Sequence, residues 1–308
     1  MTGNTISAIL FSIVNYFFII INLNIAYMKR VELKYLPLYK AFGISDLEIS
    51  TLEEDEIIPE LFLPEEAYKL LNVPTPQFGA PVIAFLLGRE KAHYTVDWNY
   101  ARALAKTGAH IRFLTYESPV SQFMGCHGLV LPGGAFASPE KFYTDPQEDD
   151  GPSPRCRAYL QLIKSAECRR IPMLGICAGA QMIGALFGLK MYRNQSYIMS
   201  DVKIEHKTKE TCAHKVKILP DTPLRKIFGT NWIWTNSRHN ESMVSDDSHS
   251  ELKFYAFAED GVPEAWGSEE RNILCVQWHP EDEAAWGNKA MQSIYDWLAQ
   301  KASAYAKK

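Results

Sequence analysis

The chain has 308 residues and a formal net charge of −4 at pH 7. This length is enough to bury the core of one large domain or two smaller ones. The slightly acidic charge balance argues against binding to nucleic acid or anionic membranes through overall charge. The six cysteines form no C-x-x-C pair that would indicate a zinc site or a disulfide framework. Such cysteine usage favours a reducing compartment, which predicts a cytoplasmic protein.

Residues 6–27 are almost continuously apolar and long enough to span a bilayer. They lack the basic start and the small-residue cleavage site of a secretory signal. Lys29 and Arg30 follow, which would keep the rest of the chain in the cytosol if the segment were inserted. The alternative is that translation begins at Met28. Residues 1–27 are therefore either a membrane anchor with a cytosolic domain behind it or a mis-assigned start.

Residues 28–80 are predicted to form an N-terminal extension and linker. Residues 50–54 resemble a helix-capping box, and residues 64–71 are predicted to form a short helix. Residues 73–81 contain three prolines and one glycine, a composition typical of a linker. We interpret the extension as a packing element, with a partner-docking arm as the alternative.

From residue 81 onward, short apolar strands alternate with helices. The predicted strands are 82–87, 111–114, 128–131 and 173–176, and the predicted helices are 96–106, 157–168 and 181–187. A later part, richer in strands, covers 216–219, 232–235, 252–258 and 272–278, and a closing helix is predicted at 284–301. This order predicts an α/β domain over 81–304 with a doubly wound, mostly parallel sheet and a strand-rich C-terminal addition.

The most informative motif is the cysteine between two glycines in residues 175–181, Gly-Ile-Cys-Ala-Gly-Ala-Gln. It follows a predicted strand and opens a predicted helix, so it is the thiol version of a nucleophile elbow. The helix N-terminus would face the sulfur of Cys177 and favour its thiolate form. The motif therefore predicts a covalent, cysteine-dependent enzyme.

A thiolate nucleophile needs a base, a group that orients the base, and an oxyanion hole. His279 follows the last predicted strand and is the candidate base, and Glu281 is placed to set its tautomer. The glycine turn at residues 133–134 and the residue after the nucleophile are the candidate oxyanion donors, through the backbone N–H groups of Gly134 and Ala178. All these residues follow strand ends, where doubly wound sheets carry their chemistry.

Three motifs together resemble the class I glutamine amidotransferase-like superfamily: residues 131–134 (LPGG), 175–181 (GICAGAQ) and 276–281 (VQWHPE). Residues 81–101, 236–239 and 263–265 are similar to its γ-glutamyl hydrolase branch, which includes γ-glutamyl-GABA hydrolases. The resemblance covers about residues 80–300. It implies a flavodoxin-like core in which Cys177 attacks a γ-glutamyl amide, His279 protonates the leaving amine and water releases glutamate from a thioester intermediate.

The resemblance also implies a glutamyl pocket. Gln181 matches a pocket position, and the predicted substrate-binding residues beside it are Gly133, Ser237, His239 and Glu241. The branch usually has Arg where this chain has Ala178, and Gln where it has Glu241. An acid at position 241 would repel a glutamyl carboxylate or attract a cationic leaving amine such as a polyamine, so the substrate stays open.

We expect no cofactor and no metal, because His206 and His214 lack a third ligand in the sequence. The expected partner is a small γ-glutamyl substrate or a glutamylated chain. We expect no binding to nucleic acid, and binding to a membrane only if residues 6–27 are an anchor. A homodimer is left open. Two other functions compete with the hydrolase: a glutaminase subunit that delivers ammonia to a separate synthase, and a non-catalytic binding protein of the same fold.

Overall fold

The computed structural model describes residues 61–63, 65–90, 93–117, 119–135, 138–148, 151–194, 200–246 and 248–307. The apolar segment 6–27 and the capping-box motif at 50–54 lie outside these residues. Among the described helices, none is both long enough and apolar enough to cross a membrane.

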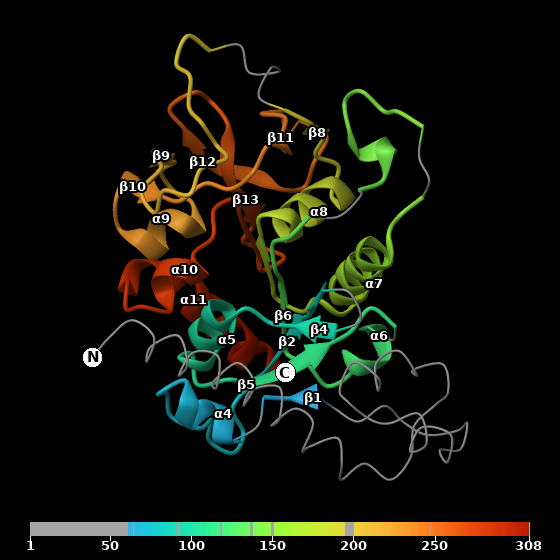
Figure 1. The fold of residues 1–308 in the computed structure, drawn as a ribbon, viewed down its shortest axis with the longest axis vertical. Helices are drawn as coiled ribbons and strands as arrows, with labels where there is room; N and C mark the ends of the chain where they lie inside the picture. The colour runs from blue at the N-terminus through green and yellow to red at the C-terminus, as the bar shows by residue number, and fades with distance from the viewer. Residues whose placement is uncertain are drawn as a thin grey trace, which may run out of the picture.

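The centre of the molecule is a ten-stranded mixed sheet with the order β1-β5-β2-β6-β7-β14-β13-β12-β9-β10 (Figure 1). The five strands β5, β2, β6, β7 and β14 run parallel to one another, and the remaining neighbours pair antiparallel. The strands are β1 (Leu61–Phe62), β2 (Val82–Leu86), β5 (His110–Leu114), β6 (Gly128–Leu131), β7 (Met173–Ile176), β9 (His214–Ile218), β10 (Trp232–Thr235), β12 (Lys253–Ala258), β13 (Pro263–Ser268) and β14 (Ile273–Val276). Two small antiparallel pairs stand apart, β3 (Gly88–Glu90) with β4 (His93–Thr95) and β8 (Met191–Tyr192) with β11 (Ser242–Met243).

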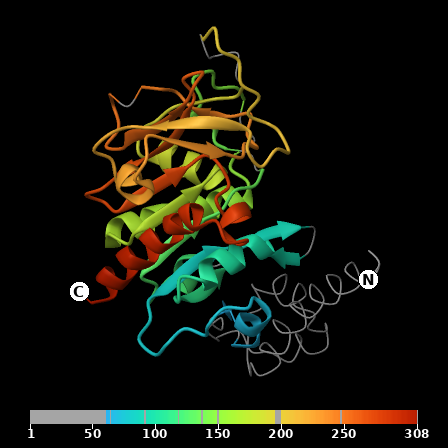
Figure 2. The same cartoon turned by 90° about the vertical axis from the view of Figure 1, so that its left-hand side faces the viewer.

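Helices cover both faces of the parallel part of the sheet. Figure 1 shows α5 and α11 on one side of the central strands and α7 and α8 on the other, and Figure 2 shows α11 in red along its face. The helices are α4 (Glu65–Leu70), α5 (Trp98–Ala105), α6 (Pro119–Gln122), α7 (Pro154–Arg169), α8 (Ala178–Leu186), α9 (Pro223–Phe228), α10 (Glu281–Ala284) and α11 (Lys289–Ala306), with a 3₁₀ turn η2 at Glu140–Phe142.

The buried side chains form two clusters, one on each face of the sheet. Within β2, Ile83 and Phe85 pack with Leu104 and Leu298 on the α5–α11 side, whereas Leu86 packs with the α7–α8 side. This alternation is the period of two that a strand buried on both faces must have. The prediction of a doubly wound α/β fold is confirmed.

Residues 61–71 belong to the packed unit. Strand β1 pairs antiparallel with the edge of β5, and Leu63, Ala67 and Leu71 are buried against the α5–α11 cluster. The helix predicted at 64–71 is α4. The packed unit therefore includes residues before position 81, where we placed the start of the domain.

Two differences from the predicted elements concern the C-terminal part. The single closing helix predicted at 284–301 is two helices, α10 and α11, separated by Gly287 at φ +108° and by Asn288, whose side chain caps α11. Strand β13 was not expected, because its sequence PEAWGS carries Pro, Glu and Gly, which are depleted in strands. It forms because β12 and β14 pair with it on either side.

Candidate active site

Cys177 stands at the turn between β7 and α8. Its backbone has φ +50° and ψ −112°, a region that residues with a side chain rarely adopt. The side chain is 8% exposed, at the N-terminal end of α8. This strained turn places Cys177 at the sheet edge and beside the first turn of α8, whose backbone N–H groups have no acceptor within the helix.

The glycine two residues after the nucleophile allows α8 to lie close against the sheet. A Cβ atom on Gly179 would be 2.0 Å from the carbonyl oxygen of Leu131, the last residue of β6. No side chain fits at that distance. The close approach of α8 to β6 brings the nucleophile turn beside the glycine turn that follows β6.

His279 comes from the strand next to the nucleophile. Strand β14 pairs in parallel with β7, with Val276 beside Ile176, so both chains leave the sheet at the same edge. The ring of His279 is held by Glu281, whose Oε1 lies 2.6 Å from Nδ1. Asn236 fixes the backbone of His279 through two 2.8 Å hydrogen bonds, from its Nδ2 to the carbonyl and from the N–H to its Oδ1.

The other ring nitrogen of His279 is the one that faces the nucleophile turn. A Cβ atom on Gly133 would lie 2.6 Å from Cε1 and 3.3 Å from Nε2 of His279, and 3.1 Å from Cβ of Cys177. The glycine at position 133 is therefore flanked by both side chains. Burial by itself lowers the pKa of His279, but the Glu281 carboxylate and the Cys177 side chain outweigh it and raise that pKa well above 6.5.

The glycine turn after β6 presents its backbone toward this site. The N–H of Gly133 donates to the hydroxyl of Tyr100 at 3.0 Å, so it is occupied. In the described part of the chain the N–H of Gly134 has no hydrogen-bond partner, and Gly134 has φ +132°. Ala178 is the first residue of α8, where the N–H has no intrahelical acceptor. These two N–H groups are the ones available to an oxyanion.

Arg155, near the start of α7, lies over the glycine turn. Its Nη2 donates to the carbonyl of Gly133 at 2.5 Å and to the hydroxyl of Tyr159 at 3.0 Å, and Tyr159 in turn donates to the carbonyl of Pro132. A Cβ atom on Gly134 would run into the Arg155 guanidinium. The turn is therefore held from the α7 side by a cation and a phenol.

Gln181 and Glu241 meet one helical turn beyond the nucleophile. The Gln181 side-chain amide donates to the backbone carbonyl of Glu241 at 2.8 Å and to Oε1 of Gln277 at 3.2 Å. The Glu241 carboxylate accepts from the Tyr143 hydroxyl at 2.9 Å. Burial raises the pKa of Glu241, with Tyr143 and Arg193 opposing that rise. The Gln181 amide thus anchors the 236–241 loop.

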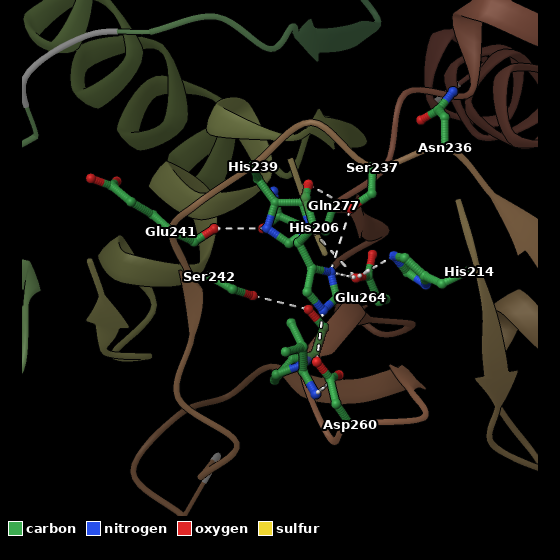
Figure 3. Close-up of polar contacts among 12 residues, drawn as sticks. His206, His214, Asn236, Ser237, His239, Glu241, Ser242, Asp260, Glu264 and Gln277 are labelled. Carbon is green, nitrogen blue, oxygen red and sulfur yellow. Dashed lines mark hydrogen bonds and ion pairs between the residues drawn. The ribbon is translucent and has the colours of Figure 1, made fainter. Parts of the chain in front are cut away.

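Ser237 and His239, which we expected to bind substrate, join a different group of side chains. The Ser237 hydroxyl donates to the backbone carbonyl of His206 at 2.8 Å, and His239 lies against Glu264 (Figure 3). His214 also reaches Glu264. The structure therefore supplies the third potential ligand that the sequence did not reveal beside His206 and His214, and it lies on the strand that we did not predict.

Sequence reasoning assigned no site role to Tyr100, Arg155 or Asn236. Asn236 stands inside a motif that we used for the resemblance, which was a usable signal. Tyr100 also stands inside such a motif, residues 81–101, although the motif gave it no role. Arg155 lies in none of these motifs, and its contact is to a backbone atom of the glycine turn. Backbone contacts of this kind leave no residue pattern in a single sequence.

A doubly wound sheet with a cysteine elbow, a neighbouring His–Glu pair and a glycine turn at one edge defines the class I glutamine amidotransferase-like superfamily. The model of the Peptidase C26 family matches residues 89–281, and the chain belongs to this family.

Curated relatives carry related names. The glutamine amidotransferase-like protein YvdE of Lactococcus lactis is 32% identical over 157 residues, which are 50% of this chain and 65% of that protein. Anthranilate synthase component 2 of Saccharolobus solfataricus is 30% identical over 154 residues, which are 50% of this chain and 66% of the relative. The chain thus spans just under two thirds of the length of these relatives.

A solved structure of a glutamine amidotransferase has a similar fold. A glutamine amidotransferase structure from Thermotoga maritima superposes with a TM-score of 0.50 at 14% identity. The superposition covers 73% of this chain and 98% of the other. At this identity the similarity supports the fold.

Proposed function

We propose that the protein is a cysteine hydrolase that cleaves a γ-glutamyl amide and releases glutamate and an amine. The observation that carries the proposal is the position of His279. Nδ1 of His279 lies 2.6 Å from Oε1 of Glu281. The opposite side of the ring, with Cε1 and Nε2, and the side chain of Cys177 both lie against Gly133. A binding protein of the same fold would have no need of a strained cysteine turn facing an oriented histidine.

The chemistry follows from the two nitrogens of the ring. The Glu281 carboxylate accepts a hydrogen bond from Nδ1–H, so the free Nε2 takes the proton from the Cys177 thiol as the sulfur attacks the δ-carbonyl carbon of the glutamyl group. The carbonyl oxygen gains negative charge and receives the N–H groups of Gly134 and Ala178. The imidazolium then gives its proton to the leaving nitrogen as the C–N bond breaks, which leaves a glutamyl thioester.

Water completes the cycle. His279 takes a proton from a water molecule as its oxygen attacks the thioester carbon, and the proton returns to the cysteine sulfur when the C–S bond breaks. The raised pKa of His279 favours the imidazolium that both halves need as a proton donor. The net reaction consumes one amide and one water and yields glutamate and an amine.

A second function is favoured by one observation. Anthranilate synthase component 2 is named for an assembly with another component, and this chain is 30% identical to it over 154 residues. The same site acting on glutamine would then supply ammonia to a partner synthase. In that case glutamine cleavage would be slow in the isolated chain and would rise when the synthase is added.

The test is glutamate release by the full-length chain from a panel of γ-glutamyl amides. The panel contains glutamine and amides of neutral, cationic and amino-acid leaving groups. We expect cleavage of at least one amide other than glutamine, with Cys177→Ala abolishing it. Cys212→Ala, the same change at an exposed cysteine, serves as the control and should retain full activity.

Each other outcome has a defined meaning. Equal activity in wild type and Cys177→Ala would remove Cys177 as the nucleophile. Cleavage of glutamine alone, and only in the presence of a co-purified synthase, would establish the second function instead. A folded protein inert on the whole panel would refute the hydrolase.

A further inference from the structure

Three histidines surround one glutamate beside the proposed active site. His206, His214 and His239 each place a ring nitrogen 3.2, 3.5 and 3.5 Å from Oε1 of Glu264 (Figure 3). All four side chains are buried, with exposed fractions of 0%, 4%, 5% and 0%. They come from a loop, from β9, from the 236–241 loop and from β13, so the cluster joins four separate segments.

The outward nitrogen of each ring already has a partner. Nε2 of His206 contacts Oδ2 of Asp260 at 2.9 Å, Nδ1 of His239 donates to the carbonyl of Glu241 at 3.1 Å, and Nδ1 of His214 faces the carbonyl of Lys215 at 3.4 Å. A carbonyl can only accept, so Nδ1 of His214 and Nδ1 of His239 each carry a proton, and Nε2 is the nitrogen that faces inward. In a neutral ring with this tautomer, Nε2 offers a lone pair to the space beside Glu264. Carbonyl or carboxylate support behind the ring is the arrangement that surrounds metal-binding histidines.

The inward atoms of His214, His239 and Glu264 are not satisfied by hydrogen bonds, whereas Nδ1 of His206 lies 3.4 Å from the hydroxyl of Ser237. Within the described residues, Nε2 of His214, Nε2 of His239 and both carboxylate oxygens of Glu264 are buried and make none. Lone pairs that face a carboxylate cannot hydrogen-bond to it. Buried polar atoms left in this state are costly unless a further group occupies the space between them.

The distances from the inward nitrogens to Oε1 of Glu264 match those between the ligands of a small tetrahedral cation. Four N or O ligands at about 2.0–2.1 Å from a tetrahedral zinc ion are separated by about 3.4 Å from one another. The three nitrogen–Oε1 distances are 3.2, 3.5 and 3.5 Å. The donor atoms of His206, His214 and Glu264 lie within 4.8 Å of one another. His239 stands outside this group of three, and its Nε2 lies 3.5 Å from Oε1 of Glu264.

We propose that this cluster is a structural Zn²⁺ site, with His206 Nδ1, His214 Nε2 and Glu264 as its core ligands and His239 Nε2 as the fourth. Imidazole nitrogen with one carboxylate is a ligand set that suits Zn²⁺, and four protein ligands close the site to substrate. The competing arrangement has no metal: a protonated His206 bridges the carboxylates of Asp260 and Glu264.

The site would act on the active site through the 236–241 loop. That loop begins at Asn236, which clasps the backbone of His279, and ends at Glu241, whose carbonyl accepts from both His239 and Gln181. A metal bound to His239 would therefore fix the segment between these two anchors. The ligands would be positioning residues, outside the acyl-transfer chemistry.

The experiment measures metal content and thermal stability of the full-length chain, purified without metal-affinity steps. We expect about one zinc per chain by elemental mass spectrometry. Stripping with a chelator should lower Tm, and Zn²⁺ added at about a hundredfold excess over its Kd should raise Tm again by roughly 5 °C, whereas Mg²⁺ should not. X-ray absorption at the zinc edge should show nitrogen and oxygen ligands without sulfur.

Two histidine variants separate a specific site from stray binding. His214→Gln should lose the zinc and the Zn²⁺-dependent rise in Tm, whereas His249→Gln, the same change at an exposed histidine, should keep both. If His214→Gln does not fold, the zinc content of the wild-type chain and the response of its Tm to chelator and Zn²⁺ still test the site. A wild-type chain that holds no zinc and whose Tm responds neither to chelator nor to Zn²⁺ would overturn the site in favour of the protonated His206 bridge.

Discussion

The hydroxyl of Tyr100 accepts a hydrogen bond from the backbone N–H of Gly133 at 3.0 Å. The same oxygen lies 3.5 Å from Nδ1 of His279, the nitrogen that Glu281 holds. Tyr100 lies on α5 with a side chain only 7% exposed. Helix α5 therefore braces the glycine turn and the histidine together, and it leaves the N–H of Gly134 as the one the turn can offer to substrate.

Tyr100→Phe should lower kcat, with only a small loss of thermal stability. The change leaves the part-buried N–H of Gly133 without its acceptor, which costs less than the roughly 1–3 kcal/mol of a fully buried donor, and it frees the turn that carries the proposed oxyanion donor. We expect kcat to fall about tenfold or more. Tyr305→Phe is the matched control, because it removes a 3.0 Å hydrogen bond to the carbonyl of Arg169 far from the site. Equal kcat in both variants, with equal loss of Tm, would contradict the bracing role.

Gly133→Ala should lower kcat strongly while the protein still folds. The added methyl would lie 2.6 Å from Cε1 of His279, so the ring must move away from Cys177. Losing the base geometry or one oxyanion donor costs about 10²–10³ in kcat. Gly88→Ala is the control, since its Cβ would meet only ordinary contacts at 3.6 Å. Wild-type kcat in Gly133→Ala would show that the His279 ring is not where catalysis needs it.

Glu281→Gln should move the alkaline limb of the pH–rate profile to lower pH. The Glu281 carboxylate is a main cause of the raised pKa of His279, so its removal lets the imidazolium lose its proton earlier. Because the amide also orients the ring poorly, we expect kcat to fall about 10³–10⁴-fold. Glu283→Gln removes an equal charge from the same helix and should leave the limb in place. A limb unmoved by Glu281→Gln would mean that another group titrates there.

The same shift makes stability depend on pH. The folded protein binds the His279 proton more tightly than the unfolded chain does. Its contribution to the free energy of unfolding is therefore complete below about pH 6.5 and is lost as the pH rises through the folded-state pKa. Urea unfolding of wild type and Glu281→Gln across this range measures it. The difference in unfolding free energy between the two proteins should shrink as the pH rises. A difference that grows with pH would contradict the raised pKa of His279 in the folded protein.

Glu241→Gln should change substrate ranking rather than abolish activity. If the Glu241 carboxylate attracts a cationic leaving amine, its removal should lower kcat/KM for cationic amides relative to neutral ones, by about tenfold. Tyr143→Phe removes the 2.9 Å hydrogen bond to the same carboxylate but keeps the charge, so the ranking should persist. Panel kinetics at low and moderate salt measure the effect. An unchanged ranking in Glu241→Gln would exclude this residue from amine selection.

The parts of the molecule that local pattern controls were predictable. Apolar runs of four or five residues predicted the central strands, with 128–131 and 173–176 at their observed bounds. The convergence of Cys177 and His279 followed from a general rule, that parallel strands end at one edge of a sheet. The β14–β7 pairing brings these two strand ends together.

The parts that depend on long-range packing were not predictable. Strand β13 has poor strand formers and exists because two neighbours hold it. Glu264 on that strand could not be associated with His206 before the strand itself was known. Ser237 and His239 matched a motif near the site, yet their side chains turn to the histidine cluster. A motif gives a residue's position along the chain, whereas the direction of its side chain is decided by what packs around it.

Strand β1 covers the outer edge of β5, which otherwise ends the parallel side of the sheet. An uncovered edge offers a row of backbone donors and acceptors to any other extended chain. A shortened chain that began at residue 81 would keep the proposed catalytic residues but expose that row. We expect such a chain to associate edge to edge and to precipitate on refolding, so the two residues Leu61 and Phe62 contribute to solubility out of proportion to their number.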